Sequence, residues 1–400
     1  MSAGPLDGIV VLDLSRALAG PIAAMAMGDM GARVIKVETP SGGDDSRSWG
    51  PPFVGTEEDR HSTYFMSANR NKESVVADLK SDHGQETLTK LIRRADVLIE
   101  NFRPGGFARL GFTPEVLEQI NPRLITLSVT GFGHDGPEGA RPGYDQIAQG
   151  EAGLMSVTGS PESGPTRIGV PIADVLAGIH GALGIASALI ARQATGHGAV
   201  VRTSLLAASI SAHVFHGTKW TVGKEVSEPT GNHHPQIAPY GSFRTRDGWV
   251  QLAVGTEAIW KCFAVAMGID ADDPRFATNH LRVSNRDVLV SRIEEALAAS
   301  ERSSLVEQLT EAGVPAGAIR TLDEVYEWDQ TLSQGLVIDV DHAALGPIQL
   351  PGPAIRIETA TGASILRNTH DAPPVLGEDT ETIQLWLEET ATEFGEQRTA

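Results

Sequence analysis

Residues 8–38, GIVVLDLSRALAGPIAAMAMGDMGARVIKVE, predict how the first half of the chain folds. Their opening run, residues 8–14, is rich in β-branched side chains and is typical of a buried strand, and residues 33–37 have the same character. Residues 19–30, between the two runs, have the composition of a helix. A strand, a helix and a second strand in this order predict a βαβ unit with parallel strands.

Strands and helices continue to alternate beyond this unit. The runs at residues 97–100 and 124–129 predict strands, and residues 84–94 and 114–120 predict helices. This alternation favours an α/β fold with a mainly parallel sheet, so we expect a Rossmann-like large domain.

The character of the sequence changes after a strand predicted at residues 199–203. The next thirty or so residues carry histidines, glycines and polar residues without a clear period, which indicates a connection between domains. Strands and helices resume near Pro239 and predict a smaller α+β domain. We therefore expect residues 1–205 as the first part of the large domain, 206–235 as a crossover linker, 236–325 as the small domain, and 326–400 as a return linker and the completion of the large domain.

The charge balance limits the classes of partner. The chain of 400 residues has 32 Lys and Arg against 51 Asp and Glu, a formal net charge of −19 at pH 7. Nucleic acids and anionic membranes are bound by broad basic surfaces, so this balance argues against both.

Cys262 is the single cysteine, which excludes an internal disulfide and a cysteine-cluster metal site. The start of the chain does not resemble a secretion signal, and we expect a cytoplasmic protein.

The longest apolar stretch, residues 175–191, raises the question of a membrane span. It contains His180, three glycines and many alanines. We therefore expect a helix that is buried within the protein on most of its sides.

The first turn of the opening unit bears on the kind of ligand. It reads SRALAGP (residues 15–21) and lacks the three-glycine spacing that lets backbone amides approach a pyrophosphate. A nicotinamide or flavin site is therefore not expected, although Glu38 ends the second strand where such sites keep an acid.

Basic residues gather near turns in this part of the chain: Arg16, Lys36, Arg47, Arg70, Lys72, Arg103 and Arg109. Cations in loops at strand ends suit phosphates or carboxylates, and solvated surface charge is the alternative for each.

Asp174 lies in GVPIAD (residues 169–174), at the start of the long apolar helix. A carboxylate in the first turn of a helix meets unpaired backbone amides and the positive end of the helix dipole, so we expect it to be ionised at neutral pH. Asp174 is thus a candidate nucleophile, with a plain helix cap as the alternative.

Histidines offer weaker candidates. His134 lies in the glycine-rich TGFGHDGP (residues 130–137) and is either a base or a surface residue. His233 and His234 are adjacent and would point apart in a strand, so we expect no metal site there.

An ordered series of motifs runs from about residue 6 into the 350s: LDLSRALAGP, GARVIKVE, GGDDSRSWGPPF, NRNKES, ENFRPGG, TGFGHDGP, RPGYDQIAQ, GLMSVTG, NHLRVSNR, AGVPAGAI and LPGPAIR. Together with the stretch around Asp174, this series resembles the family III coenzyme A transferases, the relatives of formyl-CoA transferase and carnitine CoA-transferase. The run from LDLSR through DDSRSWGPPFVGTE is most similar to the branch that acts on dicarboxylic acyl groups, such as succinate–hydroxymethylglutarate CoA-transferase.

The resemblance implies an enzyme, a CoA-transferase whose two chains interlock as a homodimer. Its substrates would be a coenzyme A thioester and a carboxylic acid, with no permanent cofactor and no metal. The family's nucleophilic aspartate falls on Asp174, and an active-site tyrosine falls on Tyr144. The residues implied to bind coenzyme A are Leu18, Ala19, Lys72, Asn101, Phe102 and Arg109. The far carboxylate of a dicarboxylic acyl group would be held by an arginine, and Arg16, Arg47 and Arg103 are the candidates.

Three positions depart from the family pattern. Leu18 stands where formyl-CoA transferase has an active-site glutamine, which makes oxalate and formate poor candidate substrates. A glycine-rich loop of some relatives is reduced here to Val254-Gly255-Thr256. Arg202 occupies a place where many relatives have aspartate.

The expected chemistry is nucleophilic catalysis by a carboxylate. Attack on an acyl-CoA gives a mixed anhydride and then an enzyme thioester, and backbone amides near the helix start are expected to stabilise the oxyanions.

The leading alternative is an α-methylacyl-CoA racemase or epimerase of the same fold, which needs acid and base groups on both sides of the α-carbon. The racemase branch has histidine where this chain has Tyr144, and tyrosine is a poor base at neutral pH. A coenzyme A-binding protein without turnover is a third possibility, against which the pair Asp174 and Tyr144 argues.

Overall fold

The computed structural model of the protein describes residues 4–139 and 141–397. The chain divides into two compact units. The first comprises the residues up to Ala152, Ile168–Thr218 and the residues from Gln330 onward, and the second comprises Gly153–Arg167 and Lys219–Asp329. Residues 153–167, which we expected in the large domain, therefore belong to the smaller unit.

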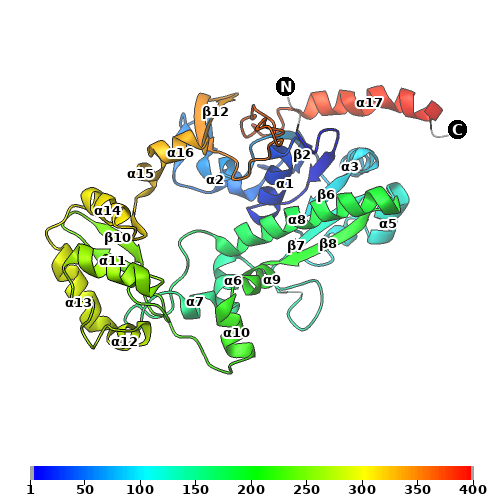
Figure 1. Ribbon diagram of the computed structural model, residues 1–400. Coiled ribbons are helices and arrows are strands. Elements are labelled where there is room, and N and C mark those ends of the chain that lie inside the picture. The colour runs from blue at the N-terminus through cyan, green and yellow to red at the C-terminus, as the bar shows by residue number, and fades with distance from the viewer. Residues whose placement is uncertain (1–3, 140, 398–400) are drawn as a thin grey trace. The chain divides into compact units, whose positions relative to one another are not determined.

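A six-stranded parallel sheet forms the centre of the first unit (Figure 1). In spatial order its strands are β5 (Lys72–Val76), β2 (Arg33–Glu38), β1 (Val10–Asp13), β6 (Val97–Glu100), β7 (Ile125–Thr130) and β8 (Ala199–Ser204). Numbered along the chain within this sheet, the order is 3-2-1-4-5-6, which is the Rossmann order. The prediction of an α/β fold with a mainly parallel sheet is confirmed.

Helices cover both faces of this sheet. Three of them lie on one face: α1 (Ala19–Asp29), α8 (Ile172–Thr195) and α9 (Leu205–Ser211). On the other face lie α3 (Asp82–Arg94), α5 (Pro114–Ile120) and α17 (Thr380–Gln397). Neighbouring strand residues point to opposite faces, so Val11 belongs to the first core and Leu12 to the second.

Helix α8 is buried on one side only. A Cβ atom at Gly178 would lie 2.8 Å from the carbonyl oxygen of Ala19, so glycine is what allows α8 to pack directly on α1. On the opposite side, Ile179, Leu183 and Ile190 are 54%, 63% and 70% exposed. The expectation that this helix is buried on most sides is therefore wrong for the single chain, because no other part of residues 4–139 and 141–397 covers this side. Within the described residues, α8 is also the one helix that is long and apolar enough to cross a membrane.

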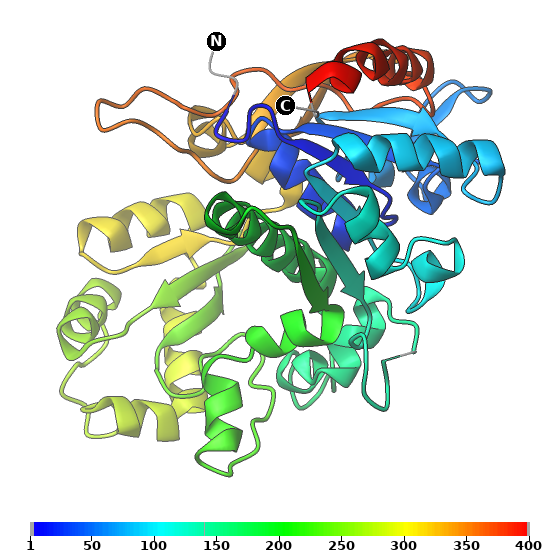
Figure 2. The ribbon, with the colours of Figure 1, turned by 90° about the vertical axis from the view of Figure 1, so that its right-hand side faces the viewer.

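The C-terminal part of the chain covers the open edge of the sheet at β5. The backbone amides of Ser74 and Val76 donate to the side chains of Asp379 (2.8 Å) and Thr380 (3.1 Å). Ile383 of α17 then packs into the second core. Figures 1 and 2 both show α17 beside elements from the first hundred residues, and the end of the chain is thus part of the first unit.

The second unit has an antiparallel sheet of three strands, β11 (Ala316–Ala318), β10 (Trp249–Ala253) and β9 (Tyr240–Arg244). The helices that accompany it include α11 (Glu257–Met267), α12 (Asn279–Ser284), α13 (Arg286–Leu297) and α14 (Arg302–Glu311). Trp260, Phe263 and Phe276 are at the centre of its own core. This mixture of strands and helices agrees with the expected α+β character.

Shorter elements complete the chain. Two hairpins pair β3 (Phe53–Gly55) with β4 (Arg60–Ser62) and β12 (Val337–His342) with β13 (Gly346–Pro351). The short helices are η1 (Asp45–Ser48), α2 (Thr63–Met66), α4 (Gly106–Arg109), α6 (Asp145–Glu151), α7 (Leu154–Val157), α10 (Phe215–Thr221), α15 (Leu322–Tyr326) and α16 (Asp329–Ser333).

Candidate active site

A cavity of about 700 Å³ lies in the first unit at the carboxyl ends of β1, β6 and β7. Ligands of α/β sheets bind at this edge, because the loops that follow the strands meet there. The starts of α6 and α8 complete the walls. The lining includes Arg16, Leu18, Ala19, Trp49, Tyr64, Asn101, Phe102, Arg103, Tyr144, Asp145 and Asp174.

The turn after β1 is held in a strained conformation. Ala17 has a φ of 65°, a left-handed value that costs free energy for any residue with a Cβ atom. Its amide donates to Asp44 Oδ1 at 3.0 Å. Asn101 binds the neighbouring backbone twice, since its Oδ1 accepts from the Arg16 amide (2.9 Å) and its Nδ2 donates to the Arg16 carbonyl (2.8 Å). These bonds fix the turn so that Arg16 and Leu18 line the cavity.

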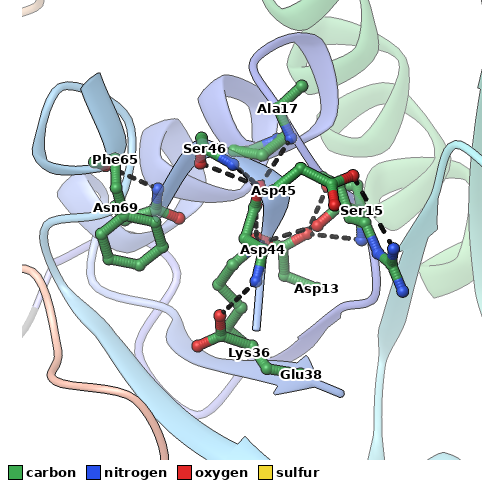
Figure 3. A network of polar contacts seen from close by, with 12 residues as sticks. Asp13, Ser15, Ala17, Lys36, Glu38, Asp44, Asp45, Ser46, Phe65 and Asn69 are labelled. Carbon is green, nitrogen blue, oxygen red and sulfur yellow. Dashed lines mark hydrogen bonds and ion pairs between the residues drawn. The ribbon is translucent and has the colours of Figure 1, made fainter. Parts of the chain in front are cut away.

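A buried network of charges connects this turn to η1 (Figure 3). Lys36 Nζ lies 2.9 Å from Asp44 Oδ2 and 3.6 Å from Asp13 Oδ2, and it donates to the Ser15 carbonyl at 2.8 Å. Lys72 Nζ donates to the same Asp13 oxygen at 2.8 Å. Burial alone would raise the pKa of Asp13, but Lys36 and Lys72 lower it to about 2. The two lysines and two aspartates therefore balance one another in charge and hold the turn and η1 together.

The three arginine candidates have different surroundings. Arg47 binds both oxygens of Glu38, at 2.8 and 2.7 Å, and its guanidinium lies 3.7 Å from the centre of the Phe65 ring. It does not line the cavity, because these contacts direct it away from the turn. Arg16 and Arg103 do line the cavity, and Arg16 lies 3.8 Å from Asp45 with its side chain 45% exposed.

Two carboxylates meet at the start of α8. Asp145 Oδ1 accepts from the amides of Ala173 (2.8 Å) and Asp174 (3.4 Å). Its other oxygen accepts from the buried Gln149 side chain at 2.7 Å, so Asp145 is held in place by both helices. Burial and the charge of Asp145 raise the pKa of Asp174 to about 7.

This arrangement corrects the expectation for Asp174. We expected free amides at the helix start to keep it ionised and to stabilise oxyanions. Asp145 instead occupies the amides of Ala173 and Asp174 and adds a negative charge. Near pH 7, Asp174 is therefore divided between its protonated and ionised forms.

Two tyrosines lie near this pair. Tyr144 is 70% exposed, immediately before α6, and lines the cavity. Tyr64 also lines it and packs edge-on against Trp49, with 5.0 Å between ring centres. Burial and then the charge of Asp174 raise the pKa of the Tyr64 hydroxyl, so it stays protonated at neutral pH.

Comparison with known proteins identifies the family. The sequence model of CoA-transferase family III matches residues 6–380. The chain belongs to this family. A succinate–glutarate CoA-transferase of Agrobacterium fabrum is 41% identical over 84% of this chain and 85% of the relative. An acetyl-CoA:oxalate CoA-transferase of Acetobacter aceti is 38% identical over 88% of this chain and 89% of the relative.

A solved structure has the same fold. A CaiB/BaiF family protein from Brucella suis aligns with a TM-score of 0.87 at 38% identity, over 96% of this chain and 99% of that one. The prediction of a family III CoA-transferase is confirmed, and its substrates are coenzyme A thioesters and carboxylic acids.

Only some of the residues that we predicted to bind coenzyme A in this CoA-transferase line the cavity. Leu18, Ala19, Asn101 and Phe102 line the cavity. Lys72 is buried, and its amine is bonded to Asp13, Asn69 and the Pro21 carbonyl. Arg109 is exposed at the end of α4 and does not line the cavity.

Several residues of this CoA-transferase site were not found from the sequence. Asp145 directly follows the predicted Tyr144, and its signal was an acidic residue opening a helix. Tyr64 had no signal of its own, since only the fold brings it to Trp49. Within residues 4–139 and 141–397, His, Cys, Asp and Glu form no group of three or more that could hold a metal ion.

Proposed function

We propose that this CoA-transferase moves coenzyme A from a dicarboxylic acyl-CoA, with succinyl-CoA as the donor, to a dicarboxylic acid. The observation that carries the proposal is the position of Asp174, whose carboxylate lies on the same cavity as Arg16 and Arg103. Both relatives named above support a dicarboxylic acceptor, because glutarate and oxalate are dicarboxylic acids, and the succinate–glutarate relative also supports the succinyl donor. We include oxalate among the acceptors to be tested, although Leu18 made it a poor candidate.

Asp174 acts as the nucleophile in this proposal. Its carboxylate attacks the thioester carbonyl, a C–O bond forms, the C–S bond breaks, and coenzyme A leaves as a thiolate. The product is a mixed anhydride between Asp174 and the acyl group. The thiolate then attacks the Asp174 carbonyl, the C–O bond to the donor acid breaks, and the donor leaves as a carboxylate. The acceptor carboxylate reverses both steps on the resulting aspartyl-CoA thioester, so no proton is consumed overall.

The elevated pKa of Asp174 suits this role. A carboxylate of higher pKa is a stronger nucleophile once it is ionised, and at a pKa of about 7 the ionised form is still well populated at neutral pH. Asp145 therefore has a positioning role, because it fixes the helix start and maintains this pKa.

Arg16 and Arg103 are the proposed partners of the far carboxylate. A guanidinium can bind a carboxylate with two parallel hydrogen bonds, which is worth most in a partly desolvated site. Arg47 is less suited, since both of its donor positions facing Glu38 are already used.

The decisive experiment is Asp174→Asn, which keeps the shape of the side chain and removes the nucleophilic charge. Transfer from succinyl-CoA to glutarate should fall by several orders of magnitude, with the unfolding midpoint nearly unchanged or raised. Hydroxylamine added to the wild-type enzyme with succinyl-CoA should leave a hydroxamate at position 174, detected by mass spectrometry. Near-normal transfer by Asp174→Asn, with deamidation excluded by the same method, would place the nucleophile elsewhere. Exchange of the α-proton with solvent deuterium without transfer would favour the racemase alternative.

We also propose that two copies of the chain form a homodimer, interlocked as the family resemblance implies. The exposed residues Ile179, Leu183 and Ile190 follow one side of α8, and Val214 and Phe215 are exposed at the start of α10. Exposed apolar patches of this kind mark protein interfaces, and a second copy would cover them.

A further inference from the structure

A second cavity lies beside the candidate active site, also within the first unit. Its volume is about 470 Å³, within the range of ordinary small-molecule sites. It shares one wall with the first cavity, formed by Phe102, Arg103, Pro104 and Thr130. The rest of its lining comes from α4, α5, the end of β6, β7, β8 and adjoining loops, and neither Asp174 nor Tyr144 lines it.

One side of this second cavity is apolar and largely aromatic. The rings of Phe102 and Phe107 stack with 5.5 Å between centres and 6° between planes, and Phe107 and Phe112 stack at 5.1 Å. Leu117 and Leu124 extend the same wall. Such a surface fits an aromatic ring or a branched hydrocarbon group.

The inner end carries a chain of polar side chains. Glu100, 8% exposed, accepts from the Ser128 hydroxyl and from the Phe102 amide (2.8 Å). His134 Nε2 lies 2.9 Å from the Ser128 hydroxyl oxygen. Burial raises the pKa of Glu100, which reduces the negative charge that it presents near neutral pH.

Positive charge is concentrated on the remaining lining. Arg103 and Arg202 both line the cavity and are exposed, and neither takes part in the ion pairs formed by the described residues. Glu118 is the other acidic residue of the lining. Two unpaired guanidinium groups at one hollow are notable on a chain whose net charge is −19, because they attract anions to that place.

We propose that this cavity is a second ligand site, which binds a small carboxylic acid with an apolar body. The carboxylate pairs with Arg202, with Arg103 nearby, and the apolar body packs against Phe107, Phe112 and Leu117. A cationic ligand is disfavoured by the two arginines, and a neutral ligand would leave both unpaired. The site gives Arg202 a function of its own.

The site can be tested by ¹⁹F NMR titration of the full-length protein with 4-fluorophenylacetate, and with 4-fluorophenylacetamide as the neutral match. The acid should bind saturably and at least tenfold more tightly than the amide. Arg202→Gln should weaken binding of the acid roughly tenfold, the cost of one charge-assisted pair. Arg93→Gln, the same change at an exposed arginine outside the cavity, should leave binding unchanged.

A blocking variant gives an independent check. Ala108 lines the cavity and is exposed, so Ala108→Trp should fill the space without disturbing the core and should abolish binding. Circular dichroism verifies its fold, and transfer activity should persist in Arg202→Gln. The proposal is overturned by an absence of saturable binding, by equal affinity for acid and amide, or by full affinity in Arg202→Gln, the last showing that the probe binds elsewhere.

Discussion

The Asp145 carboxylate accepts a hydrogen bond from the backbone amide of Asp174 at 3.4 Å, so the proposed nucleophile has a second negative charge beside it. The same carboxylate accepts from Ala173 and from Gln149, and these bonds leave it little freedom to move away. The elevated pKa of Asp174 is thus a property of the fold.

The pH dependence of transfer should reflect this pair. Because the pKa of Asp174 is raised to about 7, kcat/KM should increase as the pH rises through 7 and level off roughly one pH unit above it. Asp145→Asn keeps an oxygen acceptor for the helix amides and removes the charge, so the rise should move to lower pH. Asp7→Asn, at an exposed position, is the matched control. An unchanged profile in Asp145→Asn would show that Asp145 does not influence the ionisation of Asp174.

Selectivity for a dicarboxylic donor should depend on Arg16 and Arg103. Arg16→Gln and Arg103→Gln should each lower kcat/KM for succinyl-CoA about tenfold or more, since a charge-assisted pair contributes about 2 kcal/mol. The same variants should act on butyryl-CoA, which lacks the far carboxylate, nearly as well as the wild type does. If both donors lose activity equally, the arginines do not recognise the carboxylate.

The buried charge network should be sensitive to the loss of one member. Lys36→Met leaves Asp13 and Asp44 short of a partner in a dry environment and should lower the free energy of unfolding by about 3–5 kcal/mol. Lys80→Met, at an exposed position, should cost less than about 0.5 kcal/mol. Urea unfolding monitored by tryptophan fluorescence measures both.

Low pH should weaken the stabilising effect of the same charge network. The pKa of Asp13 is lowered in the folded chain from 3.8 to about 2, so its stabilising contribution is present above pH 4 and is lost as the pH falls toward 2. The difference in stability between wild type and Lys36→Met should shrink over that interval. A difference that stays constant would mean that the ion pairs contribute little.

The proposed dimer can be disrupted at α8. Leu183 is 63% exposed in the single chain, and Leu183→Glu should prevent association, because a charge at a buried interface is costly. Val265→Glu, at an 80% exposed position in the second unit, serves as the control and should leave the dimer intact. Sedimentation velocity at several concentrations distinguishes the two. A stable dimer of Leu183→Glu would exclude this face from the interface.

The sequence was most informative where local pattern and tertiary role agree. The β-branched run at residues 97–100 forms β6 as predicted, because such side chains suit a strand covered on both faces. Strand β5 was missed because it opens with Lys72 and Glu73, charged residues that the local pattern assigns to a loop. Its position beside β2 is decided by partners far along the chain, among them Asp379.

The charged residues illustrate the limit of sequence reasoning about sites. Lys36, Arg47 and Lys72 were interpreted as cations for a ligand, yet each is paired with a carboxylate of the protein. Nothing in the local sequence tells a cation that faces a cavity from one that faces a buried aspartate, because the partner comes from another strand. The position of Asp174 at a helix start could be predicted because that start is visible in the sequence, whereas the influence of Asp145 required the geometry of two helices.

The closure of β5 by residues near the end of the chain has a consequence for synthesis. All six strands of the central sheet have left the ribosome soon after residue 204 is translated. The edge amides of Ser74 and Val76 can form their hydrogen bonds only after Asp379 and Thr380 have been translated as well. At ordinary elongation rates that interval lasts roughly ten to thirty seconds. During this time the nascent chain presents an open strand edge to its surroundings, and residues translated long after the last strand of the sheet are the ones that remove it.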